Sequence, residues 1–387
     1  MRARGVRLLL FVSFAVLCAN ALGVERFPPP EFDTHQLPKT TVPAARGVLF
    51  AYLDTAVFVA AMCISAYFVL KKRSRRAMFI LMLFCLAYFG FYRKGCVCPI
   101  GAIGNISLAL FGNGYSVPIV VVLFFVLPLI FSLFFGRVFC GAVCPLGAIQ
   151  DAVVIKPIAI PGWLERGLRI IAYLYLALAV LLAATGKGFI ICRYDPFVGF
   201  FRLAGSVNMI IVGVCFLIAG MFIGRAYCRF FCPYGVLLRL CSRLSRKHLT
   251  ITPDECIKCR LCEDACPFGA IDKPTVEWVA EDYAKSKRRL TALIVLLPVF
   301  VAAGCAAGYG IYKSVTDDTK MFAGSIICGG FVGLVTGAKL IRESIRFKRD
   351  KYEANKGTCY SCGRCFEYCP VHKKGIRDKT QGIRHKA

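Results

Sequence analysis

Histidine is scarce in this sequence, which has four histidines among 387 residues, against 22 cysteines. None of the histidines (His35, His248, His372, His385) lies in a long apolar stretch, which excludes a membrane haem b held by two axial histidines. No Cys-x2-Cys-His occurs, so covalently attached haem c is excluded as well. A glycine-rich dinucleotide fingerprint and a phosphate-binding loop are also missing, so the chain has no recognisable NAD or ATP site.

Acidic residues are also few, with Asp+Glu 22 against Lys+Arg 49 and a formal net charge of +27. In a soluble protein this excess would suggest nucleic acid. A hydrophobic content of 58% and a mean hydropathy of +0.64 instead indicate a membrane protein and exclude disorder. The basic residues gather on one side of the expected membrane topology, so we expect membrane lipid and no nucleic acid as a partner.

Seven apolar stretches approach the length of about 20 residues that a helix needs to cross the hydrocarbon. They lie near 48–70, 77–92, 117–139, 168–186, 207–227, 290–312 and 321–341. The basic run Lys71 to Arg76 places the end of the first stretch in the cytoplasm. The sequence therefore predicts an all-α polytopic protein of the bacterial cytoplasmic (inner) membrane, with its C-terminus in the cytoplasm.

The N-terminus has the pattern of a targeting segment. Basic residues up to Arg7 precede the apolar run Leu8 to Leu17, and Ala19-Asn20-Ala21 follows. We expect residues 1–23 to be a signal peptide or an uncleaved signal anchor. Residues 24–47 are rich in proline and are expected to form an extracytoplasmic linker. The membrane domain is then expected over 48–249.

Two cysteine runs match the bacterial ferredoxin pattern C-x2-C-x2-C-x3-C-P. The runs are Cys256, Cys259, Cys262, Cys266 and Cys359, Cys362, Cys365, Cys369, each followed by proline. Three closely spaced thiolates can wrap one face of a cubane, and the fourth can begin a helix in which proline tolerates the missing N–H. A structural zinc site is the alternative, but four-thiolate zinc sites usually pair two C-x2-C units over a longer gap. We expect two [4Fe–4S] clusters.

The two runs are separated by two apolar stretches, which return the chain to the same side of the membrane. In two-cluster ferredoxins the fourth cysteine of each run ligates the cluster of the other run. We therefore expect a cytoplasmic ferredoxin module with halves 250–289 and 342–387, the latter including a basic tail, split by a transmembrane hairpin at 290–341. The expected ligand sets are Cys256/Cys259/Cys262/Cys369 and Cys359/Cys362/Cys365/Cys266. Self-contained sites remain the alternative.

Two copies of a second motif follow the third and fifth apolar stretches. They read GRVFCGAVCPLGAI from Gly136 and GRAYCRFFCPYGVL from Gly224. Both copies point the same way, so Cys140, Cys144, Cys228 and Cys232 can meet at one depth and hold a third cluster. Buried packing cysteines are the alternative. The arginine of each copy could offset cluster charge, or its side chain could extend to the membrane surface.

A further group of cysteines is expected on the outer side. Cys96-x-Cys98-Pro99 repeats the Cys-Pro-x-Gly pattern, and Cys192 lies on the same side of the expected topology. Together they could hold an outer cluster, with Asp195 as a candidate fourth ligand. A disulfide or free thiols remain open on an oxidising face. The isolated cysteines, Cys241 among them, are expected to be packing residues.

These motifs resemble the polyferredoxin-type membrane 4Fe–4S proteins of the NosR/NapH family, over roughly residues 77 to 370. The resemblance implies membrane electron transfer from a quinol or cytoplasmic donor to an acceptor on the outer side. The chain departs from the larger members because residues 24–47 are too short for a periplasmic flavin domain. The same motifs are similar to FixG/CcoG-type oxidase accessory proteins, which implies metal reduction during assembly.

We therefore expect an iron–sulfur electron-transfer protein, a subunit of an oxidoreductase complex rather than a stand-alone enzyme. Its expected partners are a flavoprotein or a cytochrome on the outer side, and a soluble donor or quinone on the other. A metal-reducing assembly factor for a respiratory oxidase and an iron–sulfur redox sensor are the alternatives. No residue is expected to perform bond chemistry, because the clusters would carry the electrons.

Overall fold

The structure is a computed structural model that describes residues 47–95, 98–112, 115–155, 157–158, 160–202, 207–252, 256–275, 280–315, 319–344 and 349–371. The expected signal segment, almost all of the expected linker, Cys96 and most of the basic tail lie outside the described residues.

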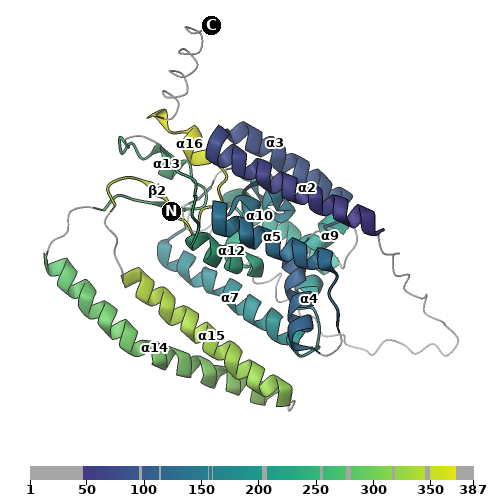
Figure 1. Ribbon diagram of the computed structural model, residues 1–387. Coiled ribbons are helices and arrows are strands. Elements are labelled where there is room, and N and C mark those ends of the chain that lie inside the picture. The colour runs from purple at the N-terminus through teal and green to yellow at the C-terminus, as the bar shows by residue number, and fades with distance from the viewer. Residues whose placement is uncertain are drawn as a thin grey trace, which may run out of the picture.

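The described chain is mostly helical, and the helices of its first part pack into a bundle (Figure 1). Several short π-helices interrupt the α-helices, and one of them carries Cys140. In chain order the elements up to the second motif are α2 (Val48–Tyr67), η1 (Phe68–Lys72), α3 (Arg75–Cys85), η2 (Leu86–Tyr92), α4 (Pro99–Phe111), α5 (Ile119–Phe135), η3 (Phe139–Val143), α6 (Pro145–Ala152), α7 (Gly162–Ala184), α8 (Ile190–Tyr194), α9 (Pro196–Arg202), α10 (Val207–Phe222), α11 (Ala226–Phe230) and α12 (Pro233–Arg243).

Five of the described helices are long and apolar enough to cross a membrane: Val48–Lys72, Arg75–Tyr92, Leu164–Ala184, Lys287–Gly310 and Met321–Ile341. The stretches predicted at 117–139 and 207–227 appear as the shorter apolar helices α5 and α10. Both end shortly before or at a Gly-Arg pair, where Gly136 and Arg225 have positive φ angles (74° and 53°) that an α-helix cannot continue through. A further short apolar helix, α4, follows Cys98.

The helix α2 packs against η2, which continues α3, through buried aromatic rings and through an ion pair with Arg93 at the end of η2. Phe58 contacts Phe89 edge-on at a ring separation of 5.7 Å. Asp54 has no exposed side-chain surface and lies 2.8 Å from an Arg93 nitrogen, while the Tyr88 hydroxyl donates to it at 2.9 Å. A buried carboxylate is tolerated here because both of its oxygens have a partner.

The ferredoxin region contains α13 (Leu261–Asp264), β1 (Ile271–Asp272), β2 (Glu353–Ala354) and α16 (Arg364–Glu367). The strands pair antiparallel, with Ile271 opposite Ala354, and the Asn355 amide donates to Asp272 at 3.0 Å. The two halves, which are far apart in the sequence, therefore fold into one unit.

The helices α14 (Ala280–Val315) and α15 (Thr319–Ser344) lie between these halves in the sequence and pack side by side (Figure 1). Their backbones touch at glycines: a Cβ at Gly304 would lie 2.2 Å from the carbonyl oxygen of Gly329, and one at Gly308 would lie 2.2 Å from that of Ser325. Small residues of this kind permit the close approach seen between membrane helices. The α15 helix in turn contacts α7, where the Cys328 thiol donates to the Ala177 carbonyl at 3.2 Å.

Candidate functional site: three sets of cysteines

The two ferredoxin loops have the same backbone conformation. Lys258 and Arg260 in the first loop have φ of 55° and 65°, and Ser361 and Gly363 at the matching places of the second have φ of 52° and 80°. Left-handed residues are uncommon outside glycine, so their repetition at the same two positions shows that both loops curl in the same way. In each loop a short helix, α13 or α16, begins directly after the second left-handed residue. Alternating conformations of this kind turn backbone N–H groups toward one point, which suits an anionic group.

The first ferredoxin site is defined by Cys256, Cys259, Cys262 and Cys369. These four residues line one cavity together with Ile251, Thr252, Ile257, Arg260, Tyr352 and Val371. Cys369 belongs to the second cysteine run, so the structure brings it to the three cysteines of the first run. Burial raises the pKa of the Cys262 thiol to about 11, and the neighbouring Cys256 and Cys259 add to the effect.

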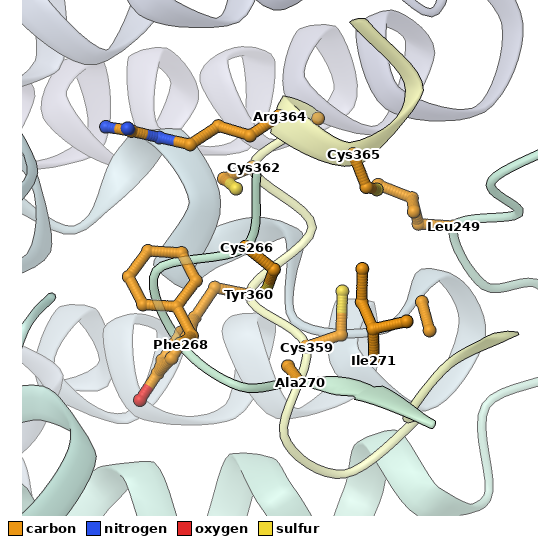
Figure 2. A pocket seen from close by; sticks show the side chains of 12 residues that line it. Leu249, Cys266, Phe268, Ala270, Ile271, Cys359, Tyr360, Cys362, Arg364 and Cys365 are labelled. Carbon is orange, nitrogen blue, oxygen red and sulfur yellow. The ribbon is translucent and has the colours of Figure 1, made fainter. Parts of the chain in front are cut away.

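The second ferredoxin site is defined by Cys359, Cys362, Cys365 and Cys266. Figure 2 shows these residues around one cavity, with Leu249, Phe268, Tyr360 and Arg364 beside them. The Ser361 N–H donates to the Cys359 sulfur at 3.4 Å. Burial raises the pKa of the Cys365 thiol. The helices α13 and α16, which follow the two loops, pack against each other, so the two sites are neighbours. The cysteines are thus brought together in crossed sets, and ligation of clusters by these sets remains a prediction.

The membrane quartet is defined by Cys140, Cys144, Cys228 and Cys232. Cys140 lies in η3 and Cys228 in α11, while Cys144 and Cys232 cap the N-termini of α6 and α12, each followed by proline in the first turn. The structure brings all four together. Burial raises the pKa of the Cys144 thiol well above its usual value, and the charges of Cys228, Cys140 and Cys232 raise it further.

Hydrogen-bond donors surround the sulfurs of the membrane quartet. An Arg137 nitrogen lies 3.6 Å from the Cys140 sulfur, the Gln150 amide nitrogen 3.3 Å from that of Cys228, and the Gly235 N–H 3.3 Å from that of Cys232. Donors of this kind stabilise thiolate charge and orient ligands. Gln150 is fully buried, yet sequence reasoning missed it because a single glutamine carries no motif.

The arginines of the two motif copies cross over. A Cβ at Gly235 would lie 3.4 Å from an Arg137 nitrogen, and a Cβ at Gly147 would lie 3.2 Å from an Arg225 nitrogen. Each arginine thus packs against the glycine of the other copy, which gives the Cys-Pro-x-Gly pattern a steric reason. Arg137 is 1% exposed and Arg225 is fully buried, so neither side chain extends to the membrane surface.

The surrounding charge fits an anionic group held by thiolates. Arg137, Arg225, Arg229 and Arg239 are all buried, and two of the three guanidinium nitrogens of Arg137 have no hydrogen-bond partner within the described chain. Arg225 and Arg229 have carboxylate partners in Asp151 and Glu165, so the uncompensated charge is that of Arg137 in particular. Burying a cation without counter-charge is costly. A cubane whose four irons are bound by cysteine thiolates would supply the negative charge next to it.

Zinc and a cubane make different demands on four thiolates. A tetrahedral zinc site needs all four sulfurs at about 2.3 Å from one atom. The thiolates around a cubane bind different irons, and the C-x2-C-x2-C-x3-C-P spacing of the ferredoxin runs is that of cubane ligands.

The outer residues are only partly placed. Cys96 lies outside the described residues, but Cys98 and Cys192 come close, because the Cys192 sulfur lies 3.4 Å from the Cβ position of Gly101 in the first turn after Cys98. One Asp195 oxygen accepts the Phe197 N–H at 2.9 Å and the other lies 3.5 Å from the Tyr227 hydroxyl. The carboxylate expected as a fourth ligand is therefore engaged in starting α9 and in contacting Tyr227.

Comparison with known proteins connects two of these cysteine sets with 4Fe–4S binding. One family model, described as a 4Fe-4S binding domain, matches residues 117–169 and 206–252, which contain the two copies of the membrane motif. A second model, also described as a 4Fe-4S binding domain, matches residues 249–272, which contain the first ferredoxin run. No solved structure gives a significant match.

Three curated relatives share part of the chain. The "Putative electron transport protein YccM" of Escherichia coli is 34% identical over 28% of this chain and 33% of its own length. The "Protein NirI" of Paracoccus denitrificans is 32% identical over 30% of this chain and 18% of its own length. The "Uncharacterized protein MJ0750" of Methanocaldococcus jannaschii is 35% identical over 25% of this chain and 40% of its own length. The chain thus spans less than half the length of each of these relatives.

Proposed function

Since this chain is a polyferredoxin-type membrane protein with 4Fe–4S binding domains, we propose that it conducts single electrons from a soluble or quinone donor to a partner protein on the other side of the bacterial inner membrane. The crossed cysteine sets of the two ferredoxin sites hold one [4Fe–4S] cluster each, and the membrane quartet holds a third. These clusters each accept and release one electron, and the chain fixes their order, spacing and surroundings.

The observation that carries this proposal is the continuous arrangement of the three cysteine sets. The helix α13 of the first ferredoxin loop packs against α16 of the second. Tyr360 of the second loop then reaches the quartet, since its hydroxyl donates to the Cys228 carbonyl at 3.2 Å and its ring lies 4.3 Å from the Arg137 guanidinium carbon. The three sets therefore follow one another as neighbouring positions, which supports the passage of an electron from the first site to the quartet.

The first ferredoxin site is the point at which electrons arrive. Its loop is exposed at Cys259, and the flanking Ile257 and Leu261 are 62% and 46% exposed. The cysteines of the second run are all buried, so of the two described ferredoxin loops the first is the more accessible to a soluble carrier. Exposed apolar residues around a redox centre suit a transient contact with such a carrier.

The outward path leads from the quartet through Tyr227, the residue before Cys228. Its hydroxyl contacts Asp195, and its ring packs edge-on against Phe197 at 5.3 Å. The proximity of the Cys192 sulfur to Gly101, in the first turn after Cys98, supports an outer site at these residues. We propose that Cys98 and Cys192, with Cys96, form the outer terminus that serves a flavoprotein or cytochrome.

The membrane orientation follows from the basic residues. The ferredoxin module and the C-terminus face the cytoplasm, since the run Lys71 to Arg76 ends the first membrane helix on that side. The short helices α5 and α10 complete seven crossings together with the five long helices. The α14–α15 hairpin then returns the chain to the ferredoxin module.

Vesicles can test electron passage across the membrane. Purified full-length protein is placed in liposomes that contain trapped ferricyanide, and dithionite is added outside, so that ferricyanide bleaches only if electrons cross. We expect bleaching in the wild type and in Cys241→Ser, a control in α12 outside every cysteine set, and none in Cys232→Ser. Iron and sulfide analysis of the same preparation should give about twelve irons per chain for three clusters. Equal bleaching in protein-free liposomes, or about eight irons with full activity, would contradict the proposal.

A further inference from the structure

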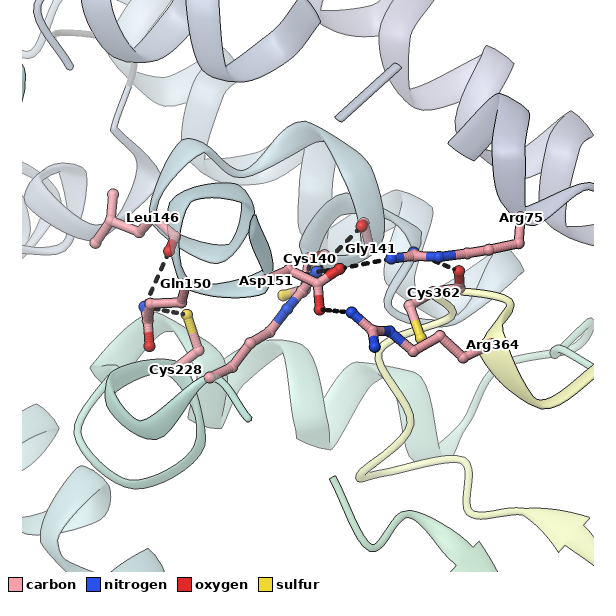
Figure 3. Close-up of polar contacts among 10 residues, drawn as sticks. Arg75, Cys140, Gly141, Leu146, Gln150, Asp151, Cys228, Cys362 and Arg364 are labelled. Atoms are coloured by element: carbon pink, nitrogen blue, oxygen red, sulfur yellow. Dashed lines mark hydrogen bonds and ion pairs between the residues drawn. The ribbon is translucent and has the colours of Figure 1, made fainter. Parts of the chain in front are cut away.

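Asp151 joins the membrane domain to the second ferredoxin site. It lies in α6, the helix that begins after Cys144, and its side chain has no exposed surface. Figure 3 shows the Asp151 carboxylate next to arginines from separate parts of the chain. The carboxylate lies 2.8 Å from an Arg75 nitrogen, 3.2 Å from one of Arg364 and 3.7 Å from one of Arg225.

The same arginines continue to the cysteines on both sides. The other terminal nitrogen of Arg75 donates a hydrogen bond to the Cys362 carbonyl at 2.9 Å, and Arg364 itself lines the second ferredoxin site. Arg225 donates to the Cys140 carbonyl and, at 3.3 Å, to that of Gly141. An unbroken series of polar contacts therefore runs from Cys362 in the second ferredoxin site to Cys140 in the membrane quartet, with Asp151 at its centre.

The electrostatics keep this carboxylate charged. Burial alone would raise the pKa of Asp151, but Arg225, Arg75 and Arg364 outweigh it and hold the pKa below its usual value. Each of these cations would lose a buried partner if the carboxylate were neutral. Buried ion pairs with several partners fix one geometry, because any other arrangement leaves a charge unpaired.

We propose that Asp151 is a positioning residue that locks the second ferredoxin site onto the membrane quartet and so sets the rate of electron passage between them. This rests on the proposed function. In the step concerned, the second site is oxidised by one electron and the quartet is reduced by one, and no bond or proton is exchanged. Asp151 takes no part in the electron path itself and acts through Arg75, Arg225 and Arg364.

The test compares Asp151→Asn with Asp350→Asn in the full-length protein. Asp350 is an exposed carboxylate of the ferredoxin region, so this control makes the same chemical change away from the contact. Arg364→Gln serves as a second variant, because it removes one ion-pair partner of Asp151 on the ferredoxin side and changes no residue of the membrane helices. For each variant, iron and sulfide are counted, magnetic coupling between the two reduced sites is measured by EPR, and reduction of the quartet is followed after rapid mixing with dithionite.

We expect Asp151→Asn and Arg364→Gln to keep their iron but lose the magnetic coupling. The contact between the second ferredoxin site and the membrane quartet should be about a hundredfold weaker, because an ion pair at that contact is broken. The quartet should then be reduced more slowly while the ferredoxin sites are reduced at the wild-type rate. The double variant Asp151→Asn/Arg364→Gln should show the same coupling and the same rate of quartet reduction as Asp151→Asn alone, since both substitutions act on one contact. Wild-type coupling and rates in both variants would refute the role of Asp151 and leave the proposed function standing. A quartet that dithionite never reduces in the wild type would instead refute the proposed function.

Discussion

Gly141, next to Cys140 of the membrane quartet, packs directly against the backbone of the second ferredoxin loop. A methyl group added at Gly141 should push the two apart. A Cβ at Gly141 would lie 2.7 Å from the Tyr360 carbonyl oxygen and 3.0 Å from that of Ser361. Ordinary contact begins at 3.4 Å, so Gly141→Ala requires the loops to separate by about 0.7 Å. Both obstacles are backbone atoms, which cannot rotate away as a side-chain end can.

We expect Gly141→Ala to lower the free energy of unfolding by about 1–3 kcal/mol, the usual cost of inserting a methyl group into a packed interior. The separation should also weaken the hydrogen bond from Tyr360 to Cys228 and the magnetic coupling between the two sites. Thermal unfolding in detergent measures the first effect and EPR of the reduced protein the second.

Gly167→Ala is the matched control, because Gly167 lies in α7 and a Cβ there would meet nothing within 4 Å. That variant should be neutral or slightly stabilising, since alanine favours a helix by up to about 1 kcal/mol over glycine. If Gly141→Ala behaved like Gly167→Ala in both measurements, the close packing of the loops would be refuted.

Three further predictions concern the other sites. Cys369→Ser should remove the EPR signal of the first ferredoxin site while the second is kept, and loss of the second signal instead would mean that the sites are self-contained. Asp54→Asn leaves Arg93 without its buried partner and should cost about 3 kcal/mol in thermal unfolding; no change in unfolding temperature would show that the pair is not buried. Gly308→Ala forces the α14–α15 backbones apart at Ser325 and should increase protease cleavage in the hairpin, and wild-type resistance would contradict that packing.

Spacing alone predicts that the first three cysteines of each ferredoxin run share one loop, whereas the crossed fourth cysteine was expected from the two-cluster ferredoxin pattern, with self-contained sites as the alternative. A run of C-x2-C-x2-C fixes three thiols in one tight loop, and the position of the second run after a helical hairpin brings Cys369 back to the first. The twin membrane motifs placed Cys140 and Cys228 at one depth for the same reason. Such predictions work because they depend on local loop geometry, which spacing determines.

The contacts around the cysteines could not be predicted in this way. Arg137 and Arg225 could be read from sequence either as counter-charges or as side chains reaching the membrane surface, and only the packing shows that they cross into the other motif copy. Asp151 and Gln150 belong to no motif, because their roles depend on partners distant in the sequence. The apolar stretches at 117–139 and 207–227 were predicted too long, since hydropathy does not register the positive φ angles at Gly136 and Arg225.

The exchange of fourth cysteines has a consequence for how the protein is made. Cys266 leaves the ribosome long before Cys359, and Cys369 follows only after both helices of the hairpin have been synthesised. Under the crossed ligation proposed above, neither ferredoxin site would be complete before Cys369 has been synthesised, so iron loading of both sites would wait for the second run. The iron content of these two sites would then report whether the hairpin has reached its final place.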